Sequence, residues 1–258
     1  MREYKDLVKE TLHGGAIKPV RQGQTREKFG EQLTFHLVIG FPILTGRKMH
    51  LQGILGELAA FLKGPTHIKD FNDKGCNFWD IFADDDGSLR LAYGNAWRNF
   101  NGVDQLTRVV ERLKTNPYRR SHLVSAWDPT GLDKLTLKCC HYSYQWSANI
   151  DGTLDMIWVQ RSADLMLGLP SDIVVAAALN LLMAQTVGMQ PGKIVLQLGS
   201  VHVYSAHYEA AEEYLNRGIH YLPSYQLDPK ATVFNFEPEM LKLKYYRHEP
   251  HLNFEILP

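Results

Sequence analysis

The sequence predicts a mixed α/β (α+β) layered domain, in which helices alternate with long strands that are able to pair in antiparallel fashion. Residues 51–62 and 103–114 carry apolar side chains at helical spacing. Residues 141–149 and 193–205 are rich in aromatic and β-branched residues, as strands are. The chain has no internal repeat, low-complexity tract or Pro/Ser-rich linker. We therefore expect one domain, residues 1–258.

The first half of the chain alternates three helical segments with one strand. Residues 2–13 form an amphipathic helix, with its apolar residues at helical spacing. Residues 33–39 form a strand. Residues 51–62 form a helix that Gly64 ends, and residues 103–114 repeat the same pattern.

The second half contains most of the predicted sheet. Strands are predicted over residues 121–127, 141–149, 153–160 and 193–205. Asp151-Gly152 is a strong hairpin signal between two of them. Helices are predicted from Pro170 to Gly188, with Ser171 as N-cap, and over residues 206–217, closed by Gly218. The C-terminal segment is poor in helix signals and rich in proline and aromatic residues.

Composition indicates a protein of the cytoplasm, or of the host cytoplasm if a phage encodes it. Acidic and basic residues balance at 28 each, so nothing favours nonspecific nucleic-acid binding. Cys76, Cys139 and Cys140 cannot form a disulfide framework, and the N-terminus lacks the apolar stretch of a signal peptide. The longest apolar helix candidate, residues 173–187, is too short to span a bilayer. We expect no membrane partner and no bound metal.

Four arginines form the first candidate constellation. Arg119 and Arg120 precede a predicted strand, Arg161 ends another beside Ser162, and Arg21 lies in a Gly-rich stretch. Guanidinium forks match phosphate oxygens, and a serine hydroxyl adds one more donor. Spacing alone does not bring the four together, and a solvated surface arginine is the simpler interpretation of each one alone.

Cys140 is the candidate nucleophile. Nearby guanidinium groups can lower the pKa of a cysteine by stabilising the thiolate. His141 is adjacent in sequence, but successive side chains of a strand point to opposite faces, so a Cys/His hydrolase is poorly supported. Asp172 begins a long apolar helix, where a carboxylate is favourable for structural reasons and is also able to read the edge of a heterocycle.

The chain resembles the thymidylate synthase family over nearly its whole length. The order and spacing of the matching segments are far more specific than any one of them. They are 40–45 (GFPILT), 56–64 (GELAAFLKG), 78–80 (FWD), 92–98 (AYGNAWR), 119–120 (RR), 125–127 (SAW), 140–141 (CH), 160–164 (QRSAD), 167–170 (LGLP) and 202–205 (HVYS).

The resemblance implies a role for each matching residue. Cys140 matches the nucleophile that adds to C6 of the pyrimidine, Glu57 the carboxylate that organises water and proton transfer, and Tyr93 a tyrosine near the C5 proton. The implied substrate ligands are Arg21, Arg161 and Ser162 for phosphate, His202 and Tyr204 for the sugar hydroxyl, and also Gln160 and Asp164. The implied ligands of 5,10-methylenetetrahydrofolate are His50, Trp79, Phe82, Asp164, Leu167 and Gly168.

The resemblance also implies an assembly. The family's layered fold has a mixed, mainly antiparallel sheet flanked by helices, and one face of that sheet forms a homodimer. Arg119 and Arg120 match an arginine pair that reaches into the partner subunit's site.

Asp172 is the departure from the common synthase that bears on the substrate, because ordinary members place Asn there. An amide can donate to uracil O4 and accept from N3–H. Cytosine instead presents an amino donor and an unprotonated N3, which a carboxyl group with a shared proton can satisfy. Asp at this position is the pattern of the deoxycytidylate hydroxymethylase branch, and residues 199–205 (GSVHVYS) also look like that branch.

Two further departures bear on whether the product carries a methyl or a hydroxymethyl group. Phe82 stands where the synthase usually has a second tryptophan, and residues 254–258 (FEILP) lack the small apolar ending that closes the synthase over its folate. Either change can admit water to the one-carbon unit.

The sequence thus predicts a hydroxymethyltransferase that converts dCMP to 5-hydroxymethyl-dCMP through a Cys140–C6 adduct. Three alternatives stay open: a thymidylate synthase or dUMP hydroxymethylase that tolerates Asp172, an enzyme for the ribonucleotide CMP, and a catalytically silent nucleotide- or RNA-binding relative. The presence of Cys140, Glu57 and the four arginines argues against the last.

Overall fold

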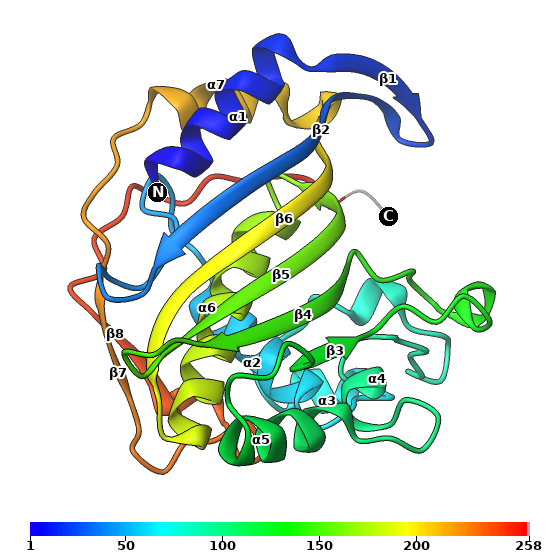
Figure 1. Ribbon diagram of the computed structural model, residues 1–258. Coiled ribbons are helices and arrows are strands. Elements are labelled where there is room, and N and C mark those ends of the chain that lie inside the picture. The colour runs from blue at the N-terminus through cyan, green and yellow to red at the C-terminus, as the bar shows by residue number, and fades with distance from the viewer. Residues whose placement is uncertain (257–258) are drawn as a thin grey trace.

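A six-stranded mixed sheet forms the centre of the molecule in the computed structural model, which describes residues 1–256. The strand order is β1-β2-β6-β5-β4-β3 (Figure 1). The strands are β1 (Ala16–Val20), β2 (Gly23–His36), β3 (Leu123–Ser125), β4 (His141–Ala148), β5 (Thr153–Asp164) and β6 (Gln190–Tyr204). Only β5 and β6 pair in parallel, so the sheet is mixed and mainly antiparallel, as predicted.

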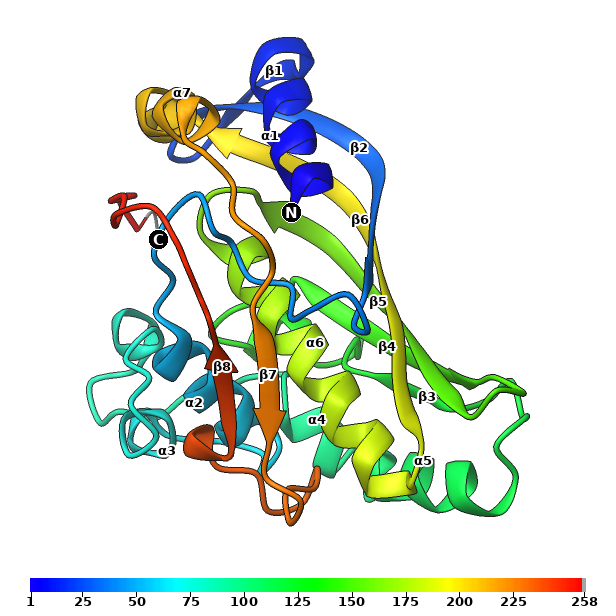
Figure 2. The ribbon, with the colours of Figure 1, turned by 90° about the vertical axis from the view of Figure 1, so that its left-hand side faces the viewer.

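Helix α6 (Gly168–Val187) crosses one face of the sheet and connects the two parallel strands (Figure 2). It packs on β5 and β6 and, on its other side, on α2. The remaining helices are α1 (Arg2–Gly14), α2 (Leu51–Phe61), α3 (Ile68–Asn72), α4 (Asn95–Arg98), α5 (Gln105–Thr115) and α7 (Tyr208–Asn216). A small hairpin of β7 (Ser224–Leu227) and β8 (Leu241–Lys244) lies beyond α6 from the sheet (Figure 2). Short 3₁₀ turns cover Asp80–Phe82, Leu132–Lys134, Ser205–His207 and Pro238–Met240.

The core lies between the sheet and α6. Alternate residues of β5, including Met156 and Trp158, are buried against the helix, whereas Ile157 and Val159 on the opposite face stay partly exposed. No helix covers that second face in the part of the chain that the structure describes (Figure 2). This one-sided burial follows from the period-two alternation of the strand.

Most predicted elements are confirmed, with corrected ends. Residues 33–39 were expected to form a strand, but β2 begins at Gly23 and ends at His36, because its polar first half pairs with β1 and β6. The strand predicted over 121–127 shortens to Leu123–Ser125. The helix predicted over 206–217 begins as a 3₁₀ turn, and Arg217 is its C-cap, so Gly218 does not close it directly.

Two predictions about α6 were wrong. Ser171 is not the N-cap, because the helix already begins at Gly168 after Leu167, and the preceding turn is held by Asp164 Oδ1, which accepts from the amides of Met166 and Leu167. The helix is also 20 residues long, so it is not too short to span a bilayer. Its residues are mostly buried inside the molecule, as in the core helix of a globular domain.

Gly94 shows how the loop after residue 90 approaches α2. Its φ is +54°, and a Cβ atom at this position would overlap the backbone carbonyl of Phe61. Glycine therefore allows the loop to lie against the end of α2. The same loop carries Tyr93, whose ring lies 5.7 Å from that of Trp79, the hydrogen-bond donor to Glu57.

Candidate active site

Cys140 lies directly before β4, where a neighbouring strand holds the backbone. The amide of Arg161 on β5 donates to the Cys140 carbonyl at 2.8 Å. The Arg161 guanidinium donates from Nε to the Cys139 carbonyl at 2.8 Å and from one terminal nitrogen to the Lys138 carbonyl at 2.9 Å. Three guanidinium N–H groups remain for an anion. Arg161 thus holds the backbone of residues 138–140, called the cysteine loop below, and stays exposed beside this loop.

Tyr93 fixes the other side of Cys140. The Cys140 amide donates to the Tyr93 hydroxyl oxygen at 2.6 Å, and Tyr93 is buried. Burial raises the pKa of the Cys140 thiol, and the nearby Asp172 adds to this, while the positive charge of Arg161 and the Tyr93 hydroxyl lower it. The charge of Arg161 thus acts in the direction predicted for the arginines, but burial outweighs it and the pKa of Cys140 is raised.

Asp172 lies on the first turns of α6 within a group of buried polar side chains. Gln160 Nε2 on β5 donates to Asp172 Oδ2 at 2.6 Å, and His141 Nε2 is 3.8 Å from Asp172 Oδ1. Burial raises the pKa of Asp172 to about 7, with a further contribution from Asp164. Near neutral pH this carboxyl group therefore exists in both protonated and ionised forms.

His141 is a partner of Asp172 rather than a base for Cys140. Its Nδ1 lies 2.6 Å from the Tyr144 hydroxyl and its Nε2 faces Asp172. His141 is buried and Cys140 is partly exposed, in agreement with the alternation expected of a strand. Burial lowers the pKa of His141 to about 3, so its ring is neutral.

Glu57 on α2 is the second carboxyl group at this site. Trp79 Nε1 donates to Glu57 Oε1 at 2.9 Å. Burial and the charge of Asp172 raise the pKa of Glu57 to about 8. Two neighbouring carboxyl groups with raised pKa values are a typical arrangement for moving protons near neutral pH.

An aromatic group continues from Glu57 toward the molecular surface. The rings of Trp79 and Phe82 lie 5.8 Å apart, and His50 packs edge-on against Phe78. Gly168 is exposed at the start of α6, where an added Cβ would lie 3.9 Å from Asp172 Oδ2. Flat rings and a bare backbone offer a surface on which a planar heterocycle can stack.

The parallel strands bring three further side chains together at their ends. Asp164 on β5 pairs in register with His202 on β6, and the ring of Tyr204 lies 5.0 Å from that of His202. Ser162 pairs in the same way with Ser200. Because these strands end at the same edge, the carboxylate, imidazole and phenol lie at the side of the sheet where α6 begins.

The arginines of the predicted phosphate site are the residues that the structure gathers least. Arg21 lies in the exposed turn between β1 and β2, beyond the pairing of Thr25 with Tyr204. Arg119 and Arg120 are exposed in the loop before β3, and their side chains make no hydrogen bond or ion pair with any residue from 1 to 256. Arg161 contacts the backbone of residues 138–140 directly.

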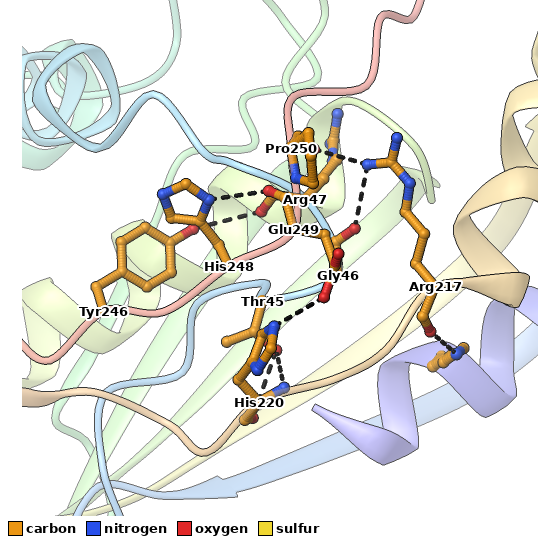
Figure 3. Close-up of polar contacts among 10 residues, drawn as sticks. Thr45, Gly46, Arg47, Arg217, His220, Tyr246, His248, Glu249 and Pro250 are labelled. Atoms are coloured by element: carbon orange, nitrogen blue, oxygen red, sulfur yellow. Dashed lines mark hydrogen bonds and ion pairs between the residues drawn. The ribbon is translucent and has the colours of Figure 1, made fainter.

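The C-terminal segment is attached to the loop before α2 by several hydrogen bonds (Figure 3). The Tyr246 hydroxyl donates to the Leu44 carbonyl at 2.7 Å, and the Glu249 amide donates to the Thr45 carbonyl at 2.8 Å. Further along, Phe254 lies 4.8 Å from the buried Arg47 guanidinium. Leu257 and Pro258, the last residues of the predicted open ending, lie outside the described residues.

Sequence reasoning missed Tyr144, Trp158 and Arg47. Trp158 Nε1 donates to Gln160 Oε1 at 3.2 Å, and Arg47 donates to the carbonyl of Met166. Trp158 and Gln160 stand two residues apart on one strand and so on one face, which was a readable signal. The contacts of Tyr144 and Arg47 with the site arise from folding and had no local signal.

A comparison with known protein families gives one match that spans almost the whole chain. The family model described as thymidylate synthase matches residues 2–257.

Proposed function

The chain belongs to the thymidylate synthase family, whose members are enzymes of folate-dependent one-carbon transfer to C5 of a pyrimidine nucleotide, and we propose that it is a deoxycytidylate 5-hydroxymethyltransferase. The observation that carries the proposal is the environment of Asp172. Its carboxyl group is mostly buried, accepts from Gln160 and has a pKa raised to about 7. A protonated carboxyl group offers one donor and one acceptor, which match N3 and the amino group of cytosine.

The family uses methylenetetrahydrofolate, and the residues of this chain fit such a group. The half-buried rings of Phe82 and Phe78 lie beside Trp79 and His50, and Gly168 leaves the start of α6 bare. We propose that these residues, with Asp164 and Leu167, hold the folate. When bound, it supplies a one-carbon unit at the oxidation level of formaldehyde.

The protein's own residues perform the remaining tasks in this proposal. The Cys140 thiolate adds to C6 of the pyrimidine, which makes C5 nucleophilic. Asp172 and Gln160 hold the base edge, and Glu57 and Tyr93 handle the proton that leaves C5. Water then provides the hydroxyl group of the product. In sum, dCMP, methylenetetrahydrofolate and water give 5-hydroxymethyl-dCMP and tetrahydrofolate.

The nucleotide's other end is assigned to Arg21, Arg161 and Ser162 for phosphate and to His202 and Tyr204 for the sugar. We propose that Arg119 and Arg120 complete the phosphate site of a partner subunit in a homodimer. Their exposure and lack of side-chain partners among residues 1–256 support this, as do Ile157, Val159 and Val195, which are partly exposed on the face of the sheet opposite α6. Apolar residues on an uncovered sheet face favour association.

Product analysis with dCMP, CMP and dUMP in parallel, each with methylenetetrahydrofolate, tests the proposal. We expect 5-hydroxymethyl-dCMP together with tetrahydrofolate. Turnover of dUMP but not dCMP would refute the base assignment, and preference for CMP would refute the deoxyribose assignment. Appearance of dihydrofolate would show reductive methyl transfer instead.

Asp172→Asn tests the residue on which the proposal depends. An amide suits uracil, so the ratio of kcat/KM for dCMP to that for dUMP should fall by about 10- to 100-fold, the effect of about 1–3 kcal/mol of mispaired buried groups. Asp155→Asn, a change of carboxylate to amide on the far end of β5, is the matched control and should leave the ratio unchanged. An unaltered ratio in Asp172→Asn would remove the carboxyl group from substrate selection.

A further inference from the structure

We propose that Tyr144 and Trp158, two fully buried side chains behind Asp172, are positioning residues that determine which hydrogen-bonding groups His141 and Gln160 turn toward it. Among the described residues, neither side chain forms a hydrogen bond with Asp172 itself. The inference rests on the proposed function, because it explains how the carboxyl group of Asp172 comes to present a donor and an acceptor in a fixed order.

Trp158 sets the orientation of the Gln160 amide. An indole nitrogen is only a donor, and Trp158 Nε1 lies 3.2 Å from Gln160 Oε1. The oxygen of the amide must therefore face Trp158, and its NH₂ group must face Asp172 Oδ2, 2.6 Å away. Gln160 is only 2% exposed, so no bulk water competes for either atom. Asp172 Oδ2 is thereby kept as an acceptor.

Tyr144 sets the tautomer of His141, because its hydroxyl group has one proton for two contacts. The Tyr144 hydroxyl lies 3.1 Å from the His141 carbonyl oxygen and 2.6 Å from His141 Nδ1. A phenol has one proton, so both contacts are satisfied together only when the hydroxyl donates to the carbonyl and Nδ1–H donates to the phenol oxygen. In that tautomer Nε2 carries a lone pair, and this lone pair faces Asp172 Oδ1.

Aromatic packing keeps the His141 ring in this orientation. Its centroid lies 4.4 Å from that of Tyr93 and 4.3 Å from that of Trp158, at tilts of 36° and 37°. Trp158 therefore acts twice, since it holds the imidazole by packing and Gln160 by a hydrogen bond. Rotation of the imidazole would require both neighbouring rings to move.

The two oxygens of Asp172 consequently differ. The Gln160 N–H that donates to Oδ2 stabilises negative charge there, so it favours Oδ1 as the protonated oxygen. His141 Nε2 lies 3.8 Å from Oδ1, beyond hydrogen-bond distance, and in this tautomer it has no N–H to donate, so the Oδ1 proton is left for the ligand. A donor beside an acceptor is the complement of cytosine N3 beside its amino group, whereas uracil N3–H and O4 require the reverse order. Tyr144 and Trp158 thus impose the order that selects cytosine.

The first experiment measures the ratio of kcat/KM for dCMP to that for dUMP in Tyr144→Phe and Trp158→Phe. Each should lower the ratio by about tenfold, the effect of one lost buried hydrogen bond. Tyr214→Phe and Trp146→Phe are matched controls, because they remove a buried hydroxyl and a buried indole N–H that have no partner among the described residues. Both should stay within about twofold of wild type. An unchanged ratio in Tyr144→Phe would overturn the inference even if Trp158→Phe does not fold.

The second experiment reads the His141 tautomer directly by ¹⁵N NMR of histidine side chains, with His141→Gln used for assignment. Wild type should show a proton on Nδ1, and Tyr144→Phe should move it to Nε2. A wild-type proton on Nε2 would overturn the inference, whatever the substrate. If wild type prefers dUMP, the proposed function fails, and the tautomer together with the change in ratio still decides the inference.

Discussion

The base end and the phosphate end of this site are built in different ways. Gln160 donates to Asp172, His141 Nε2 lies 3.8 Å from the same carboxyl group, and a single chain supplies all three side chains. Arg119 and Arg120 stand on an exposed loop without side-chain partners in residues 1–256. In our proposal, recognition of the base is therefore a property of the folded protomer, whereas recognition of the anion depends on loops and on a second subunit.

The largest effect should come from Cys140, which lies between the two ends. Cys140→Ser should lower turnover at least about a thousandfold, because a serine hydroxyl is a far weaker nucleophile at neutral pH. Release of tritium from C5 of the labelled nucleotide measures it. Cys139→Ser changes a fully buried thiol next to it and should keep most of the activity. Comparable losses in both variants would mean that the loop, not the Cys140 thiol, matters.

Replacement of Arg119 and Arg120 tests the phosphate end of the site separately from the base end. Arg119→Ala combined with Arg120→Ala should lower kcat/KM for the nucleotide by about 100-fold, since charge-assisted contacts to phosphate are lost. Mixing this variant with inactive Cys140→Ser should restore about a quarter of the wild-type sites, because each mixed dimer holds one intact site. Absence of recovery would show that the arginines serve their own chain.

The pH dependence of substrate choice tests the base end alone. Asp172 has a raised pKa of about 7, so its protonated form, which in our proposal binds cytosine, prevails below pH 7 and is lost above it. The dCMP-to-dUMP ratio should therefore fall by up to about tenfold per pH unit above 7. Titration of Glu57 and Cys140 affects both substrates and cancels in the ratio. In Asp172→Asn the ratio should be independent of pH, and a sloping ratio there would assign the titration to another group.

The smallest effect concerns stability. The pKa of Glu57 is raised to about 8 in the folded chain, so the protonated acid favours the folded state below about pH 4.5, and this contribution is lost as pH rises toward 8. Glu57→Gln keeps an acceptor for Trp79 and removes the charge. It should raise Tm by a few degrees at pH 8.5 and leave it nearly unchanged at pH 4.5. An equal shift at both values would point to packing as the cause.

The sequence predicted those helices and strands whose apolar residues recur at the spacing that turns them toward the core. Helices α2, α5 and α6 bury regular apolar stripes or are apolar throughout. Strand β1 is exposed along most of its length and contains Pro19, so no face of it carries a signal. Helices α3 and α4, of 5 and 4 residues, are too short for a period to appear.

The site also contains residues that a sequence pattern predicts and residues that no pattern predicts. Cys140, Asp172 and Glu57 were predicted because family resemblance fixes their positions. The structure places Asp172 close enough to Glu57 for its charge to raise the pKa of Glu57. The roles of Tyr144 and His141 were not predictable, since they depend on where a hydroxyl and a ring meet after folding. The role that we propose for Arg119 and Arg120 was suggested by the family resemblance, and it requires a partner chain.

The parallel pairing of β5 with β6 limits where residues can be inserted into or deleted from the chain of this enzyme. Asp164 lies opposite His202, and His202 shares a face with Tyr204. Insertion of one residue in β6 would shift this register and turn both side chains to the other face of the sheet. The loop between β3 and β4, in which Pro129, Thr130, Asp133 and Lys134 are exposed, is under no such restriction. Length variation among descendants of this gene should therefore accumulate at the rim of the molecule and be absent from its two parallel strands.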